Sequence, residues 1–283
     1  MTRRFYLQDS LAPISVKGRT IVIKYGGSAM TSVEASAFAR DVVALKHAGA
    51  RVIVVHGGGN AITSTAARLG VESTFVDGQR YTDEETIDVV MMVLAGRLNK
   101  EIVRLLCRAG GSSVGLSGVD GSLLQCVRSF ESGIDLGLVG KVTDVRTDLL
   151  ELLLQAGQIP VIAPAAVDPE GTIHNVNADL AASAVAGALH ANLLLFMSDV
   201  PGIRVGNAVA THMTASRVIA CIADGTISGG MIPKVNAALD ALHAGVVRVR
   251  IVDGRIEGIV RQAFLHDDVG TELYGQVAPV ARP

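Results

Sequence analysis

Two apolar segments of the chain run into glycines, and a lysine precedes the first group of glycines. The segment 21–23 is followed by Lys24 and then by the glycine pair 26–27, and the segment 52–55 runs through a histidine into the glycine triplet 57–59. Bare backbone amides beside a cation can bind phosphate or carboxylate oxygens. A single glycine pair fits a tight turn equally well, but two such groups, one with a lysine, favour an anion site.

Arg80 lies in the segment 77–85, DGQRYTDEE, immediately before a predicted helix. Thr82 or Asp83 can cap this helix, and Glu85 has the spacing of a capping box with Thr82. An arginine on such a fixed turn can clamp a carboxylate through two parallel hydrogen bonds. Spacing does not exclude an ordinary surface arginine, which residue type alone favours.

Two amides and a carboxylate alternate ahead of a strongly apolar helix, at Asn175, Asn177 and Asp179. They share one face if the segment is extended, although Asn177 or Asp179 can also cap the helix, and we expect capping to be part of the role of Asp179. A second lysine, Lys234, follows a glycine pair close to the start of a helix predicted at 235–244. This setting suits an anion, although an exposed lysine would look the same.

The elements that must position these residues follow from the apolar pattern. Strands are predicted at 21–25, 51–55, 113–117, 160–163 and 192–197, and helices at 34–48, 60–69, 83–108 and 235–244. The runs 21–23, 52–55, 160–163 and 193–197 within them are apolar throughout, which is typical of a parallel sheet covered on both faces. We therefore predict an α/β fold, a three-layer αβα sandwich with a mainly parallel central sheet.

The chain is expected to divide into two lobes, 1–180 and 181–283, although no linker marks the boundary. Glycines recur through the stretch 119–145 between short strand-like pieces. Such a pattern predicts hairpins over one end of the sheet, as in a lid or a substrate-side flap.

Composition excludes several classes of protein. A net charge of −2 and the absence of a long basic run argue against a nucleic-acid partner. The three cysteines are widely spaced and form no CxxC pair, which favours reduced thiols in a cytoplasmic protein and disfavours zinc. No signal peptide is recognised, and the most apolar stretch, 180–197, contains His190 and Asn192 and fits a helix followed by a strand better than a membrane span.

The standard nucleotide motifs do not fit the glycine groups. The fingerprint GxGxxG starting at Gly57 needs a small residue where Ile62 stands, and GxxxxGK[ST] is absent. A nicotinamide-dependent oxidoreductase is therefore only a minor alternative.

Seven motifs in order resemble the amino acid kinase family, and within it the acetylglutamate kinases: IVIKYGG, VVHGGG, DGQRYTDEET, VGKV with IPVIAP, NVNAD, SDVPGI and GGMIPKV. The resemblance implies phosphorylation of the side-chain carboxylate of N-acetyl-L-glutamate by MgATP, in arginine biosynthesis. It implies magnesium carried by ATP rather than by dedicated protein ligands, so none is named. A carboxylate with a pKa of about 4.3 is already a nucleophile at neutral pH, so no general base is needed.

The resemblance also implies roles for single residues. Lys24 and Lys234 would stabilise the transferring phosphoryl group, Asp179 would orient both lysines, and Gly27 and Gly58 would donate amides. The substrate would be bound in the N-terminal lobe and the nucleotide in the C-terminal lobe. The implied substrate contacts are Gly58, Gly59, Arg80 (to the α-carboxylate), Asn175 and Asn177, and the implied nucleotide contacts are Asp199, Val200, Pro201, Gly202, Ile203, Arg204, Thr226, Ile227 and Ser228.

The chain departs from the family pattern at Ser28, Asn60, Tyr81 and Val119, of which Tyr81 is expected nearest the substrate. A tyrosine there also resembles the kinases that act on aminoadipate or glutamate attached to a carrier protein, while NVNAD resembles the acetylglutamate enzymes more closely. A non-catalytic ligand sensor on the same fold is a further alternative, but it should have lost a lysine or the aspartate.

The oligomeric state is expected by analogy to be a homodimer without strong arginine control, because only about twenty residues precede the first strand and Pro13 interrupts them. An apolar helix at 87–98, with Met91, Met92 and Leu94, could bury a partner face, although core packing explains it as well. The sequence does not indicate whether a regulatory protein binds.

Overall fold

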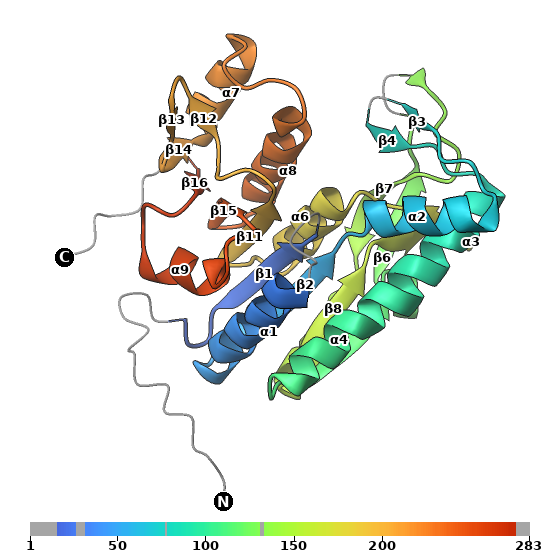
Figure 1. Cartoon of the computed structure of the whole chain (residues 1–283), viewed down its shortest axis with the longest axis horizontal. Helices are drawn as coiled ribbons and strands as arrows, with labels where there is room; N and C mark the ends of the chain where they lie inside the picture. Colours follow the sequence, from blue (N-terminus) through green and yellow to red (C-terminus); the bar gives the residue numbers. More distant parts are fainter. Residues whose placement is uncertain (1–15, 27–31, 77, 131–132, 276–283) are drawn as a thin grey trace, which may run out of the picture.

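The computed structural model describes residues 16–26, 32–76, 78–130 and 133–275. An eight-stranded sheet runs through the molecule in the order β14-β16-β15-β11-β1-β2-β8-β5 (Figure 1). Six strands are parallel, and β16 runs antiparallel to β15. The bounds are β1 (Thr20–Tyr25), β2 (Arg51–His56), β5 (Ser113–Ser117), β8 (Ile159–Ala163), β11 (Leu193–Ser198), β14 (His212–Thr214), β15 (Arg248–Asp253) and β16 (Thr271–Tyr274).

Alternate residues of the central strands pack into separate cores on the two faces of the sheet. In β1, Ile21 and Ile23 join one core and Val22 joins the other. The first core is completed by α1 (Ser32–His47), α4 (Asn99–Arg108) and α9 (Ile259–Leu265), and the second by α5 (Asp148–Gln155), α6 (Ala178–Ala188), α7 (Ala215–Ala223) and α8 (Met231–His243). Each fully buried side chain of this kind stabilises the fold by about 1.5–3 kcal/mol. The predicted three-layer sandwich is confirmed.

The helix predicted at 83–108 is helical over most of that range, but its hydrogen-bond pattern changes twice. It consists of α3 (Glu84–Met91), the π-helical segment η2 (Met92–Leu98) and α4. Together with α2 (Gly59–Leu69), α3 and η2 form a small separate core that includes Ala163 at the end of β8. This third core therefore lies over the carboxyl ends of the parallel strands.

The glycine-rich stretch forms an antiparallel pair, β6 (Leu124–Arg128) and β7 (Gly140–Val145), as the pattern predicted. A second sheet, β10-β9-β6-β7, adds β9 (Ala165–Val167) and β10 (Ile173–Asn175). The connection before β7 is anchored by backbone hydrogen bonds: the Leu138 amide donates to Thr82, and the Asn175 amide donates to Leu138. Whether this part acts as a lid stays a prediction.

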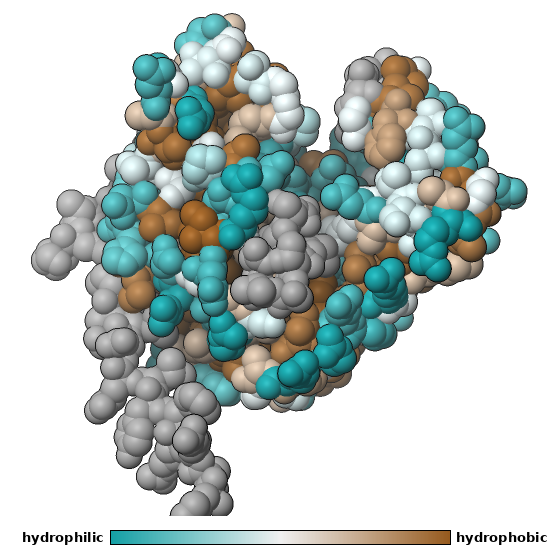
Figure 2. All heavy atoms as spheres, in the orientation of Figure 1, coloured by the Kyte–Doolittle hydropathy of each residue, from teal (hydrophilic) through white to brown (hydrophobic). Residues whose placement is uncertain are grey.

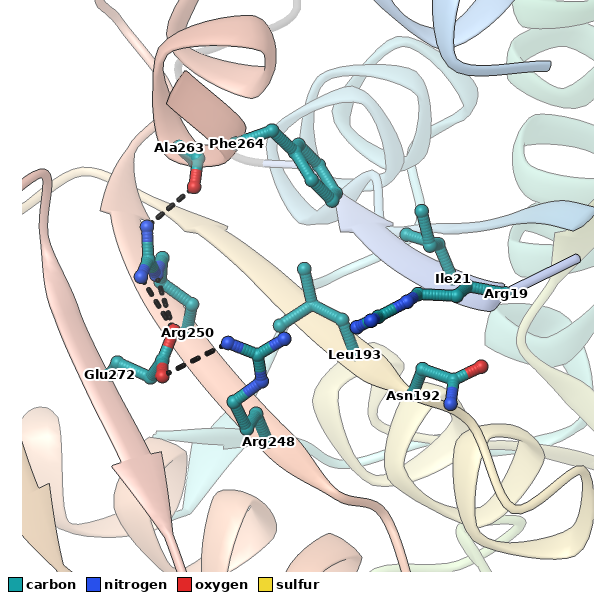
Figure 3. A pocket seen from close by; sticks show the side chains of 9 residues that line it. All are labelled: Arg19, Ile21, Asn192, Leu193, Arg248, Arg250, Ala263, Phe264 and Glu272. Carbon is teal, nitrogen blue, oxygen red and sulfur yellow. Dashed lines mark hydrogen bonds and ion pairs between the residues drawn. The ribbon is translucent and has the colours of Figure 1, made fainter. Parts of the chain in front are cut away.

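A buried ion cluster fixes the strands at the C-terminal side of the sheet. Arg250 and Arg248 converge on the carboxylate of Glu272, and Arg250 also donates to the carbonyls of Ala263 and His266 (Figure 3). Arg250 is 1% exposed. Its donors join β15, β16 and the end of α9, so the cluster stabilises the packing of these three elements.

The boundary predicted near residue 180 falls inside α6, and the eight-stranded sheet takes strands from both sides of it. The division into lobes stays a prediction.

In the part of the chain that the structure describes, no helix has the length and apolar character needed to cross a membrane. All three cysteines are free.

Candidate active site

The sheet changes its direction of winding at β1. The chain passes from β1 to β2 on one side, and β11 later pairs with the other side. In open α/β sheets, ligands bind outside the carboxyl ends of strands at such a point. A cleft of about 260 Å³ lies there, and the molecule is visibly hollowed between the part that carries α7 and α8 and the part that carries α2 and β3 (Phe75–Val76) (Figure 2).

The cleft brings together residues that are far apart in the sequence. Seven of the predicted site residues line it, and they are Lys24, Gly58, Gly59, Arg80, Asn175, Asn177 and Asp179. Lys234 does not line this cleft but reaches Asp179 from α8. Gly27 lies outside the described residues.

Asp179 connects the two lysines. Its two carboxylate oxygens lie 2.9 Å from the Nζ of Lys24 and 2.9 Å from the Nζ of Lys234. Burial by itself raises the pKa of the Asp179 carboxyl, but the charges and hydrogen bonds of the two lysines outweigh burial and hold the pKa below its usual range. The aspartate is therefore ionised at neutral pH, and it holds both ammonium groups at the mouth of the site.

Of the two capping residues that the sequence offered for the helix that carries Asp179, only Asn177 caps it. Asn177 is the N-cap of α6, and its side-chain oxygen accepts hydrogen bonds from the amides of Asp179 and Leu180. Asp179 does not cap, because its carboxylate faces the lysines. Asn177 adopts extended backbone geometry and the helix begins at Ala178, so the three polar residues do not all lie on one extended segment.

Lys234 also lies differently from the prediction. The helix expected at 235–244 begins four residues earlier, at Met231, so Lys234 belongs to its first turn. Pro233 is compatible with a first turn, because the first N–H groups of a helix have no partner within it. Lys234 therefore reaches Asp179 from the N-terminal end of α8.

The glycine triplet forms the start of α2, whose first turn carries no acidic residue. Gly58 is its N-cap, and a Cβ atom at this position would lie 2.4 Å from Leu98 and 2.7 Å from Leu94, both in η2. A larger residue at this position would force the side chains of Leu94 and Leu98 to shift. The positive end of the α2 dipole and its free amides face the cleft, as an anion site requires.

Arg80 is 7% exposed, so it is not an ordinary surface arginine. From β4 (Gln79–Arg80), it donates to Ser73 Oγ at 2.8 Å, to Thr63 Oγ1 at 2.8 Å and to the Gly59 carbonyl at 3.1 Å. Its guanidinium lies 4.6 Å from the centre of the Phe75 ring. Burial lowers the pKa of Arg80, but an arginine stays protonated in proteins. These contacts hold a cation at the wall of the cleft.

The turn after Arg80 is capped by Asp83, whose side chain accepts from the Thr86 amide. The capping box between Thr82 and Glu85 is therefore not formed. Thr82 is buried instead, and its hydroxyl donates to the Arg80 carbonyl and accepts from the side chain of Asn175. Thr82 thus links two of the predicted substrate contacts.

Tyr81, the departure expected nearest the substrate, does not line the cleft. Its side chain is 39% exposed and lies beside Gly137. A tyrosine at this position therefore says little about the acyl group that the cleft accepts.

The predicted nucleotide-binding residues lie outside the cleft that the substrate contacts line. Ile203 and Ile227 are buried in the second core, and Gly202 packs against Thr271. Only their backbone atoms could face a nucleotide. The side chains that remain exposed belong to Asp199, Pro201, Arg204, Thr226 and Ser228.

Sequence reasoning missed His56 and Asn99, two buried polar residues below the glycine triplet. His56 had a signal, because it directly follows the apolar run 52–55, whereas Asn99 lies among charged residues and had none. Among the described residues, no group of three or more histidine, cysteine, aspartate or glutamate side chains could hold a metal ion.

Known proteins match the chain over most of its length. The model of the amino acid kinase family matches residues 19–253. An acetylglutamate kinase of Chlorobaculum tepidum is 45% identical over 92% of this chain and 92% of its own length, and one of Acinetobacter baumannii is 48% identical over 90% and 88%. An N-acetylglutamate synthase of Neisseria gonorrhoeae, solved with coenzyme A and N-acetyl-glutamate, has a TM-score of 0.83 at 23% identity, over 93% of this chain and 61% of that one. The last similarity concerns the fold alone, whereas the family model and the curated relatives show that the chain belongs to the amino acid kinase family.

Proposed function

We propose that the chain transfers the γ-phosphoryl group of ATP to the side-chain carboxylate of N-acetyl-L-glutamate, giving N-acetyl-L-glutamyl 5-phosphate and ADP. Curated acetylglutamate kinases at 44–48% identity over at least 90% of the chain support this acceptor. The structural observation that carries the chemistry is Asp179 holding Lys24 and Lys234 at the rim of the cleft. A non-catalytic sensor should have lost at least one of these three residues, but all three are present and in contact.

The acyl amino acid is proposed to lie between α2 and β10. Arg80 carries a positive charge at one wall of the cleft and suits the α-carboxylate. Asn175 and Asn177 line the opposite part, where side-chain amides can bind the acetamido group. The acceptor carboxylate would then point toward the lysines.

Phosphoryl transfer needs the two anions to be held in line and the charge on the equatorial oxygens to be neutralised. Lys24, Lys234 and the amide of Gly58 are proposed to supply that neutralisation, while the acceptor carboxylate needs no general base. Magnesium enters with ATP as part of the substrate, which agrees with a site rich in cations. The positive ends of the α2 and α8 helix dipoles add partial positive charge.

The nucleotide is proposed to lie beside the ends of β11 and α7, against the backbone of 199–204 and 226–228.

A homodimer is proposed as well. Of the residues offered for its interface, Met92 is 60% exposed, whereas Leu94 is buried against Gly58. Met92 is thus the better position at which to probe association.

The test is ATP-dependent acyl phosphate formation, trapped as the hydroxamate. N-acetyl-L-glutamate, L-glutamate, L-aspartate and N-acetyl-L-aminoadipate are compared at equal concentrations. We expect a preference for N-acetyl-L-glutamate of at least about tenfold, because a buried site built for an amide rejects an acceptor that leaves it unpaired. If protein that binds ATP phosphorylates none of these free acceptors, the proposal is refuted and a carrier-linked acceptor is favoured.

A further inference from the structure

The proposed chemistry leaves one buried titratable group without a role. His56, the last residue of β2, is 0% exposed although the glycine triplet follows it directly. Its Nδ1 lies 3.0 Å from the carbonyl oxygen of Gly57, and its Nε2 lies 3.3 Å from Nδ2 of Asn99. Partners at both ring nitrogens fix the orientation of the imidazole.

The surroundings of Asn99 determine which ring nitrogen carries the proton. The Asn99 Nδ2 lies 2.9 Å from the carbonyl of Val161 and 3.1 Å from that of Leu116, while its Oδ1 accepts from Lys100 at 3.1 Å. The two carbonyls can take both hydrogens of this nitrogen, and an amide nitrogen does not accept, so a hydrogen on Nε2 of His56 would face it without a partner. The Gly57 carbonyl beside Nδ1 can only accept. Nδ1 therefore bears the hydrogen and donates it to Gly57. Burial lowers the pKa of His56 to about 4, with a smaller contribution from Lys100, so the ring is neutral at pH 7.

Peptide geometry transmits this hydrogen bond to the cleft. In a trans peptide the C=O and the next N–H point in opposite directions. Because His56 holds the Gly57 carbonyl on the buried side, the N–H of Gly58 points away from His56, toward the cleft that Gly57 and Gly58 line. Leu94 and Leu98 close the space beside Gly58 and prevent the loop from shifting that way.

We propose that His56 is a positioning residue for phosphoryl transfer, whose Nδ1–H holds the Gly57–Gly58 peptide so that the Gly58 amide is presented to the phosphoryl oxygens. Asn99 acts behind it by fixing the tautomer. The identity of the bound anion rests on the proposed function, whereas the hydrogen bond does not.

Two substitutions separate positioning from packing. His56→Asn places an amide nitrogen near the position of Nδ1 and can still donate to Gly57. His56→Gln is longer, places its amide near the position of Nε2 and can meet Asn99 but not Gly57. We expect His56→Asn to keep kcat within about threefold of wild type. His56→Gln should lower kcat about 10- to 100-fold, since loss of one oxyanion donor costs about 10²–10³.

The KM values for the two substrates help to distinguish positioning of the Gly58 amide from packing by His56. We expect those for ATP and N-acetyl-L-glutamate to change less than about threefold in His56→Gln, because the Gly58 amide is aimed at the transferring group. Thermal unfolding of both variants is measured alongside. Equal loss of kcat in both variants, or unchanged kcat in His56→Gln, would overturn the proposal.

A measurement without substrate covers variants that do not fold. The ¹⁵N NMR shifts of the wild-type histidines should show one imidazole that is neutral at pH 7 and protonated on Nδ1, with the signal assigned by its loss in His56→Asn or by through-bond correlation. An Nε2–H tautomer, or an imidazolium, would refute the positioning role. Wild-type protein that forms no acyl phosphate but has the Nδ1–H tautomer would instead contradict the proposed function.

Discussion

Asp179 and Glu272 each lie between two cationic side chains, but the two carboxylates differ in what surrounds them. Asp179 meets two lysines from β1 and α8 at the carboxyl ends of the strands, where the three side chains are 13–17% exposed. Glu272 meets Arg248 and Arg250 within the sheet, where the side chain of Arg250 is 2% exposed and that of Glu272 is 5% exposed. The first cluster lies at a cleft of about 260 Å³, whereas the second lines a pocket of only about 10 Å³ (Figure 3).

The two clusters also differ in how fully their donors are used. The guanidinium of Arg250 is occupied by Glu272 and two backbone carbonyls. Each lysine ammonium has three donors, and Asp179 takes one from each, so donors remain for an incoming anion. Arg250 is therefore engaged in holding the fold, whereas the two lysines keep donors for chemistry.

The largest effect is expected from Arg250→Met. Removing one partner of a buried ion pair leaves an uncompensated carboxylate, and the free energy of unfolding should fall by about 3–5 kcal/mol. Urea unfolding measures this loss, and kcat of the remaining folded protein should stay within about twofold. The double variant Arg250→Met/Glu272→Leu should regain much of the stability. A single variant as stable as wild type would remove the contrast between the clusters.

Lys234→Ala is expected to have the opposite pattern, with activity lost and stability kept. Its kcat should fall about 10²- to 10³-fold, as for other groups that stabilise developing charge, while the Kd for N-acetyl-L-glutamate by calorimetry changes less than about threefold. The midpoint of thermal unfolding should move little. Lys17→Ala, an exposed lysine before β1, is the control. Parallel losses of binding and rate would place Lys234 on the acceptor rather than on the phosphoryl group.

Acid should destabilise the cleft region before other parts, through His56. Its folded pKa of about 4 lies below the ordinary 6.5, so between these values the unfolded chain binds a proton that the folded chain does not. The contribution of His56 to the free energy of unfolding is therefore fully present above pH 6.5. Roughly 3 kcal/mol of it is lost as the pH falls to about 4. The lowered pKa of Asp179 acts in a separate window, below its ordinary value of 3.8.

Urea unfolding from pH 7 to pH 4, compared between wild type and His56→Asn, isolates the histidine from the other titrating groups. The wild type should lose stability more steeply across this range. Identical slopes would show that burial of His56 does not carry the acid sensitivity.

The smallest effect is expected from a surface pair, Arg40 and Glu257. Nη2 of Arg40 lies 3.1 Å from Oε1 of Glu257, and the two side chains are 61% and 62% exposed. Arg40→Ala should cost at most about 0.2–1 kcal/mol, and less in 1 M salt, since solvent screens exposed pairs. A larger loss would mean that distance alone, rather than burial and saturation, ranks the ion pairs of this protein.

The sequence predicted the sandwich and most strands because a buried parallel strand leaves a continuous apolar run, which is a local signal. Lys24 and the glycines could be recognised for the same reason, since each lies just beyond such a run. The capping role expected of Asp179 and the start of α8 were wrong, because Asn177, Asp179 and Pro233 each suit more than one position at a helix start.

Other features depend on residues far apart in the chain. The burial of Arg80 requires Ser73, Thr63 and Phe75 to surround it, and no local pattern reports this. The π-helical segment was missed because its apolar residues fit an ordinary helix. The nucleotide contacts stay predictions, as the described cleft does not include them.

The central position of β1 has a consequence for synthesis of the chain. β1 pairs with β2 soon after both are made, but its other partner, β11, lies 172 residues away by the contact between Thr20 and Asn192. At about 5–20 residues per second, one edge of this central strand stays open for roughly 9–34 s on the ribosome. During that interval the nascent sheet exposes an apolar edge that can pair with other chains, so expression yield should depend strongly on chaperones that bind emerging polypeptides.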